Sequence, residues 1–173
     1  MLSKKKSAAL LVLTALSLAG CTVQVNVPET SNSNSEQSTN RVEAGVSGDA
    51  FAEYQDQMTP LAEQEQSIIS RYDSVSGENY TDDLTMYTEL VDMVPDVRDF
   101  IAKIEAIRPT DPEIARVHEI YVEAWNAQAS GFTMTIDALE KQDIGIATEA
   151  NRYLAEGRSL MRQYIQEVGS LGN

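Results

Sequence analysis

Apolar side chains recur at intervals of three and four residues from residue 49 to the end of the chain. This spacing places side chains on one face of an α-helix, and short polar stretches divide the pattern into four stripes. The first stripe comprises Phe51, Tyr54, Met58, Leu61, Ile68, Tyr72 and Val75. The second comprises Leu84, Tyr87, Leu90, Val94, Val97, Ile101 and Ile104. The third comprises Ile114, His118, Tyr121, Trp125, Phe132, Ile136 and Leu139. The fourth comprises Ala147, Ala150, Leu154, Gly157, Met161, Tyr164, Val168 and Leu171.

Residues that favour helix ends lie between these stripes. Asp49 is a suitable N-cap for the first helix and Gly77 a suitable stop, and Pro109 ends the second helix. The third helix is expected to begin at Asp111-Pro112, a capping acid followed by proline at the first helical position. Asp143 can cap the fourth helix.

The connections between these helices are short, which makes successive helices antiparallel. The sequence therefore predicts an all-α fold, an up-down-up-down antiparallel four-helix bundle over residues 49–173. Pro60 and Pro95 lie inside the first and second helices, where each removes a backbone hydrogen bond and bends its helix. The alternative is that each proline splits its helix, which gives five or six shorter helices.

The first twenty residues have the layout of a secretory signal. Lys4, Lys5 and Lys6 precede an almost wholly apolar run from Ala8 to Leu18. A membrane-spanning helix needs about 20 apolar residues, and this run is roughly half that length. We therefore expect residues 1–20 to direct export, in preference to the alternative of a permanent transmembrane helix.

The end of this segment reads Leu18-Ala19-Gly20-Cys21 and resembles the lipobox of bacterial lipoproteins at each position. In that family the cysteine thiol receives a diacylglyceryl group, and a peptidase cleaves the chain before the cysteine. The resemblance implies that Cys21 carries the lipid that anchors the protein to the cell membrane, on the side facing away from the cytoplasm. Two or more acyl chains are sufficient for stable anchoring. The alternative is a free cysteine near an ordinary cleavage site.

Residues 21–48 are expected to form a disordered tether between the lipidated cysteine and the helical domain. The stretch from Thr30 to Asn40 is polar throughout and rich in Ser and Asn, which is typical of a flexible linker. The alternation from Val23 to Val27 could instead form a β-strand, although the sequence contains no second strand-like segment to pair with it.

The chain carries 13 Lys and Arg against 27 Asp and Glu, a net charge of −14. Removal of residues 1–20 takes away three lysines and no acids, so 10 basic residues against 27 acids leave −17. Nucleic-acid binding requires clustered cations, so a nucleic-acid partner is not expected. The single cysteine excludes an intramolecular disulfide and a cysteine-built zinc site.

Few residues are candidates for chemistry. His118, the only histidine, shares a stripe with Tyr121 and Trp125. These three side chains are most simply core residues, and the alternative is a ligand slot between bent helices. No zinc-binding helix motif, EF-hand loop, nucleophile elbow or phosphate-binding glycine loop is present. We therefore expect no catalytic residues, no metal site and no cofactor, and predict that the protein is not an enzyme.

Glu65 interrupts the first apolar stripe. Counting back from the turns of an antiparallel bundle places it near the middle of the last helix, around Arg152 to Arg158. A pair between Glu65 and Arg158 would fix the register of the two helices more than it would add stability. The alternative is that the helix rotates after Pro60 and Glu65 faces solvent.

The helical part also resembles small helical lipoproteins of Gram-positive bacteria. The resemblance rests on the helix opening Asn79-Tyr80-Thr81-Asp82-Asp83, on Pro95 within that helix, on His118 and Tyr121, and on Asn151. It implies location and fold and brings no catalytic residues. We therefore expect a binding or interaction module of the cell envelope with an envelope protein as its partner. The alternative is a small-ligand-binding or sensing lipoprotein, and the third hypothesis is an enzyme of the cell envelope.

Overall fold

The computed structural model describes residues 46–171, which are helical throughout apart from short connections. The elements are α1 (Gly48–Met58), η1 (Thr59–Leu61), α2 (Ala62–Val75), η2 (Gly77–Asn79), α3 (Asp83–Ala106), α4 (Pro112–Lys141) and α5 (Ile144–Leu171), where η marks a short 3-10 helix. No strand occurs in this range, so the all-α prediction is confirmed for it. The predicted signal, lipobox and most of the predicted tether, including the strand-like segment, lie outside the described residues.

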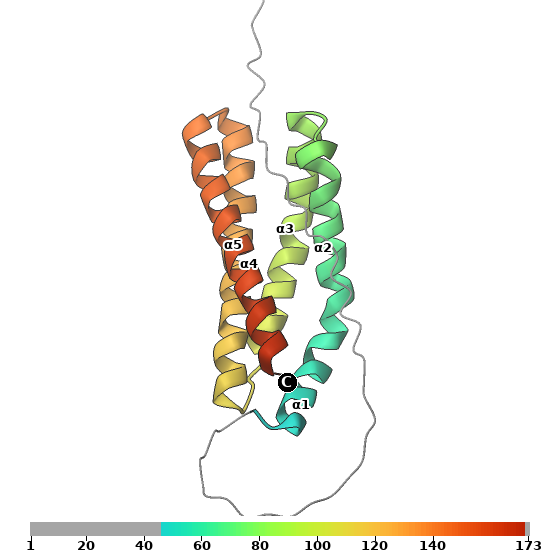
Figure 1. Ribbon diagram of the computed structural model, residues 1–173. Coiled ribbons are helices and arrows are strands. Elements are labelled where there is room, and N and C mark those ends of the chain that lie inside the picture. The colour runs from blue at the N-terminus through green and yellow to red at the C-terminus, as the bar shows by residue number, and fades with distance from the viewer. Residues whose placement is uncertain (1–45, 172–173) are drawn as a thin grey trace, which may run out of the picture.

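The long helices lie side by side, and α1, η1 and α2 together form one bent arm (Figure 1). In Figure 1 the α2–α3 and α4–α5 connections lie at one end of the molecule, and the α3–α4 connection lies at the other. The end with the α3–α4 connection also holds α1 and the last turn of α5. Helix α4 is central, because it packs against both α3 and α5.

Side-chain caps begin most of these helices. Asp111 Oδ1 accepts from the backbone N–H groups of the next helical residues at 2.9 and 3.1 Å, and Asp143 Oδ1 does the same at 2.7 and 3.2 Å. Both predicted caps are confirmed. The predicted cap Asp49 is wrong, because Ser47 caps α1 and accepts from Ala50 N at 3.2 Å. Asp49 lies in the first turn, where its charge complements the helix dipole.

The two internal prolines have different effects. Pro60 lies in η1, where three residues adopt 3-10 geometry and interrupt the α-helical hydrogen bonding between α1 and α2. The residues on either side keep right-handed helical backbone angles, so the chain bends without leaving the helical region. Pro95 lies within α3, which continues through it. The split alternative therefore applies to Pro60 alone.

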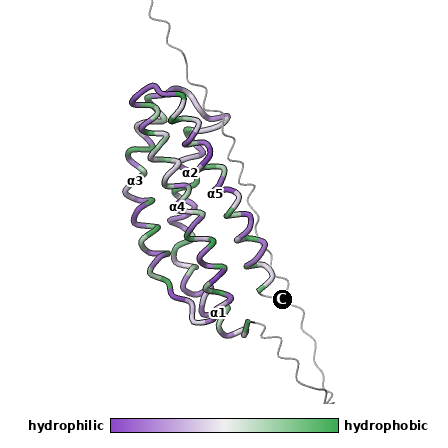
Figure 2. Tube along the Cα trace, turned by 90° about the vertical axis from the view of Figure 1, so that its left-hand side faces the viewer, coloured by the Kyte–Doolittle hydropathy of each residue, from purple (hydrophilic) through white to green (hydrophobic). Residues whose placement is uncertain are grey.

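The predicted stripes identify most of the core, with one shift in α3. Leu84 is 73 % exposed, although the sequence pattern placed it on the buried face. The buried face of α3 instead includes Met86, Met93 and Phe100. Figure 2 shows hydrophobic and hydrophilic residues alternating along each helix, as expected for helices with one face buried.

Small residues allow α4 and α5 to approach closely. A Cβ atom added to Gly157 would lie 2.9 Å from the Ala124 carbonyl oxygen and 2.7 Å from Gln128 Cγ. A Cβ added to Gly131 would lie 2.6 Å from the side chain of Leu154. The backbones of α4 and α5 therefore come together at Gly157, a small residue of the last stripe.

Candidate functional site

A cleft of about 360 Å³ lies where α1, η1 and α2 face α5. Its apolar lining comes from Met58, Leu61, Ala62, Met161 and Ile165. Its polar lining comes from Gln55, Thr59, Glu65, Tyr121 and Tyr164. Because some of these residues are exposed and Tyr121 is only 3 % exposed, the cleft runs from the surface into the core.

The break at Pro60 forms one wall of this cleft. Proline has no backbone N–H, and its ring clashes with the carbonyl four residues earlier, so a regular α-helix cannot continue through it. The flanking residues Thr59 and Leu61 both line the cleft. The bend predicted from the sequence therefore lies beside the cleft that contains Glu65 and Tyr121.

Glu65 lies at the buried end of the cleft. The indole Nε1–H of Trp125 donates a hydrogen bond to Glu65 Oε1 at 3.2 Å. Tyr121 lines the cleft beside this carboxyl group, and it lies four residues from Trp125 on one face of α4. Burial raises the pKa of Glu65 above its ordinary value, and the interactions with Tyr121 and Trp125 oppose that shift only in part.

The predicted register pair between Glu65 and Arg158 is wrong. Among residues 46–171 no ion pair involves Glu65, and its polar partners come from α4 and not from α5. Arg158 is half-buried, and its Nη1 has no hydrogen-bond partner among these residues. The alternative that Glu65 faces bulk solvent is also wrong, since the carboxyl group is half-buried beside Trp125. Glu65 lies on the same three-four stripe as the buried residues Ile68 and Tyr72, so its side chain faces the central helix α4.

A second set of buried polar groups adjoins the first. Tyr54 Oη lies 3.1 Å from His118 Nδ1 and 3.2 Å from Tyr164 Oη. His118 Nε2 lies 2.9 Å from the carbonyl oxygen of Ile104. These contacts connect α1, α3, α4 and α5 at the end of the molecule where α1 packs.

The direction of each hydrogen bond follows from the chemistry of the groups. A carbonyl oxygen only accepts, so His118 Nε2 carries a proton and donates to Ile104. In the neutral ring Nδ1 then accepts from the Tyr54 hydroxyl, whose oxygen is left to accept from Tyr164. Burial lowers the pKa of His118, which favours this neutral form. The sequence-based interpretation of His118 as a hydrogen-bonded structural residue agrees with this geometry.

The predicted ligand slot of His118, Tyr121 and Trp125 is only partly formed. The three rings are neighbours, but their exposed fractions are 4 %, 3 % and 1 %. Only Tyr121 borders the cleft beside Glu65, while His118 borders a separate hollow at the α3–α4 connection. The sequence did not indicate Tyr164, whose ring centroid lies 4.6 Å from that of Tyr121. Three sequence signals pointed to this region: the acidic residue Glu65 within an apolar stripe, the bend at Pro60 and the aromatic residue Tyr121.

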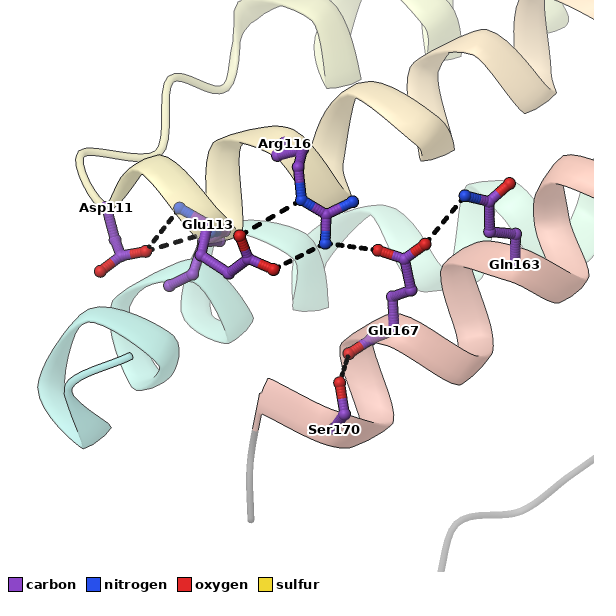
Figure 3. A network of polar contacts seen from close by, with 7 residues as sticks. Asp111, Glu113, Arg116, Gln163, Glu167 and Ser170 are labelled. Atoms are coloured by element: carbon purple, nitrogen blue, oxygen red, sulfur yellow. Dashed lines mark hydrogen bonds and ion pairs between the residues drawn. The ribbon is translucent and has the colours of Figure 1, made fainter. Parts of the chain in front are cut away.

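An ion-pair network holds the end of α5 against the beginning of α4 near this site. Arg116 Nη2 lies 2.6 Å from Glu113 Oε1 and 2.5 Å from Glu167 Oε2, and Glu167 also accepts from Gln163 (Figure 3). Exposed ion pairs add little stability. Their effect here is positional, because Glu167 lies one helical turn from Tyr164.

Within residues 46–171 no three His, Cys, Asp or Glu residues lie close enough to hold a metal ion. Of the helices described, none has the length and apolar character needed to cross a membrane. Comparisons with known protein families, with curated proteins and with solved structures found no match. The geometry of the cleft is therefore the basis on which a function can be inferred.

Proposed function

We propose that this protein is a bacterial lipoprotein, held on the outer side of the cell membrane by lipid on Cys21. The support is the sequence Leu18-Ala19-Gly20-Cys21 after a charged and an apolar segment. The substitution Cys21→Ala removes the thiol that would be acylated, so the protein should move from the membrane to the soluble fraction. Retention of this variant in the membrane would refute the proposal.

The described helices support the proposal of an up-down-up-down antiparallel four-helix bundle on this anchor. In this proposal the bent arm of α1, η1 and α2 counts as the first helix. Connections at alternate ends of the molecule support it, as does the close approach of α4 and α5 at Gly157. The tether would enter at the α1 end, which leaves the α2–α3 and α4–α5 connections at the end away from the membrane.

We further propose that the bundle is a binding module and that the cleft beside Glu65 binds a small ligand. The observation that carries this proposal is an open cleft of about 360 Å³ with apolar walls and a half-buried carboxyl group at its inner end. Small-molecule sites in proteins are typically concave, largely apolar and lined by a few well-placed polar groups. Helix bundles commonly build such sites from side chains on facing helices.

A melting experiment tests this function. The mature chain with Cys21→Ala is screened against small amphipathic compounds, and a ligand of the native state raises the melting temperature. The variant Ala62→Trp places a large ring at the exposed mouth of the cleft, so it should abolish the shifts. Shifts that persist unchanged in Ala62→Trp would place binding elsewhere and refute the cleft as the site.

An envelope protein partner is the second candidate function, favoured by exposed apolar residues at the end away from α1. Leu84 is 73 % exposed and Ile144 is 68 % exposed. Leu84 also lines a hollow with Tyr87 and Leu139. A photo-crosslinker at Leu84 in the anchored protein should capture one envelope protein, whereas the same group at exposed Glu53 on α1, at the other end of the molecule, should not. Equal capture from both positions would refute a specific surface.

A further inference from the structure

Glu65 is a half-buried acid whose hydrogen-bond partner, Trp125, is neutral. A carboxylate can accept about four hydrogen bonds, and Trp125 supplies one at 3.2 Å. Buried carboxylates are usually neutralised by a cationic partner, and no Lys, Arg or His within residues 46–171 forms an ion pair with Glu65. The carboxyl group therefore retains the capacity to accept from a cationic donor in the cleft.

The cleft walls suit an organic cation. None of the residues that line the cleft is basic, so an anion would meet Glu65 without compensation. The rings of Tyr121 and Tyr164 lie together beside Glu65 with centroids 4.6 Å apart, and aromatic faces attract ammonium groups. Met58 and Met161 supply polarizable apolar surface, which accommodates alkyl chains of varied shape.

An inorganic cation fits these walls poorly. Calcium binds six to eight oxygen ligands, and magnesium needs near-octahedral oxygen coordination. Glu65 is the only acidic residue that lines the cleft, and most of the other lining atoms are apolar. The site therefore favours a cation whose charge is carried on a carbon skeleton.

We propose that the cleft binds a small organic ammonium ion, with its charged group at Glu65 and its apolar part along Met58, Leu61 and Met161. This inference rests on the proposed small-ligand function and adds the chemical class of the ligand. The negative charge of the whole chain attracts such cations toward the protein before they reach the cleft.

The indole N–H of Trp125 provides a direct test, because Trp125 is the only tryptophan and donates to Glu65. The probes are hexylammonium, hexanol and hexanoate, which share a six-carbon chain and differ in charge. Each is added to the 15N-labelled mature chain with Cys21→Ala at constant ionic strength. Hexylammonium should shift the Trp125 indole resonance in a saturable way, hexanol should bind more weakly, and hexanoate should leave the resonance unchanged.

A matched pair of variants tests the role of the carboxylate. Glu65→Gln keeps an acceptor for Trp125 and removes the charge, so it should weaken hexylammonium binding by about tenfold or more. Glu63→Gln makes the same chemical change at an exposed position on the same helix and should leave binding unchanged. If Glu65→Gln does not fold, the pH dependence of the unaltered chain replaces it, since hexylammonium affinity should rise with pH as Glu65 ionises.

The outcomes separate the two proposals. Equal binding of hexanol and hexylammonium, or equal binding to the parent chain and Glu65→Gln, would overturn the cationic ligand and leave the small-ligand function standing. If the Trp125 resonance responds to none of the three probes and the broader melting screen is also negative, both proposals fail.

Discussion

The close contact between α4 and α5 makes Gly157 a position where one methyl group should cost stability. In an exposed helix interior, Gly→Ala stabilises a protein by roughly 1 kcal/mol through helix propensity. At Gly157 the new Cβ would lie 2.9 Å from the Ala124 carbonyl oxygen, a backbone atom that cannot move without the helix. Overpacking of this kind typically costs about 1–3 kcal/mol. These contacts also set the helix spacing that places Tyr121 of α4 against Tyr164 of α5.

Gly169 is the matched control for this substitution. It lies on the same helix, and a Cβ there would meet no heavy atom within 4 Å. The propensity gain is common to both variants, so Gly157→Ala should be less stable than Gly169→Ala by the steric cost, about 1–3 kcal/mol. Urea denaturation of the mature chain measures the difference, and heating should show a melting temperature lower by roughly 2–8 °C per kcal/mol. Equal stability of the two variants would refute the close approach at Gly157.

Two further predictions concern the buried polar groups. The pKa of Glu65 in the folded state is raised above its ordinary 4.5, so the folded state keeps a proton that the unfolded state loses as pH rises. The free energy of unfolding should therefore fall as pH rises from about 4.5 through the folded pKa, at up to about 1.4 kcal/mol per pH unit. Melting temperatures across pH should show this loss in the parent chain and not in Glu65→Gln, and parallel profiles would contradict it. Tyr54→Phe leaves His118 Nδ1 without a donor and Tyr164 without an acceptor, which should cost about 1–3 kcal/mol in urea denaturation. Tyr87→Phe removes an exposed hydrogen bond that water can replace, so it should cost less, and the reverse order would contradict the buried chain.

The helices and their ends were predictable because their signals are local. Asp111 and Asp143 cap the helices that follow them, and each needs only the backbone N–H groups two and three residues later. The buried face of α3 was harder to predict. Two apolar faces of α3 satisfy the helical period. One contains Leu84 and Leu90, and the other contains Met86, Leu90 and Met93. Only the positions of the helices packed against α3 select the second.

The site was predictable in part for the same reason. Glu65 was identifiable as an acid within an apolar stripe, but its partner depends on which neighbouring helix faces α2. The Tyr54–His118 bond joins residues 64 positions apart, and no local pattern specifies such a pair. Tyr164 was indistinguishable from a core tyrosine in the sequence, since its role beside Tyr121 depends on the spacing of α4 and α5.

The 3-10 segment at Pro60 connects these observations. A 3-10 helix turns each residue through a larger angle than an α-helix, so three residues of η1 rotate the following face by roughly 60°. The apolar stripe of α1 nonetheless continues into α2 on the same three-four spacing, since Tyr54, Ile68 and Tyr72 are all buried, and Glu65 occupies a position of that stripe. Trp125, which donates to Glu65, and Tyr121, which lines the cleft beside it, lie four residues apart on one face of α4. An apolar residue at position 65 would avoid the desolvation of a carboxyl group, and the stability given up there is consistent with a position that serves binding.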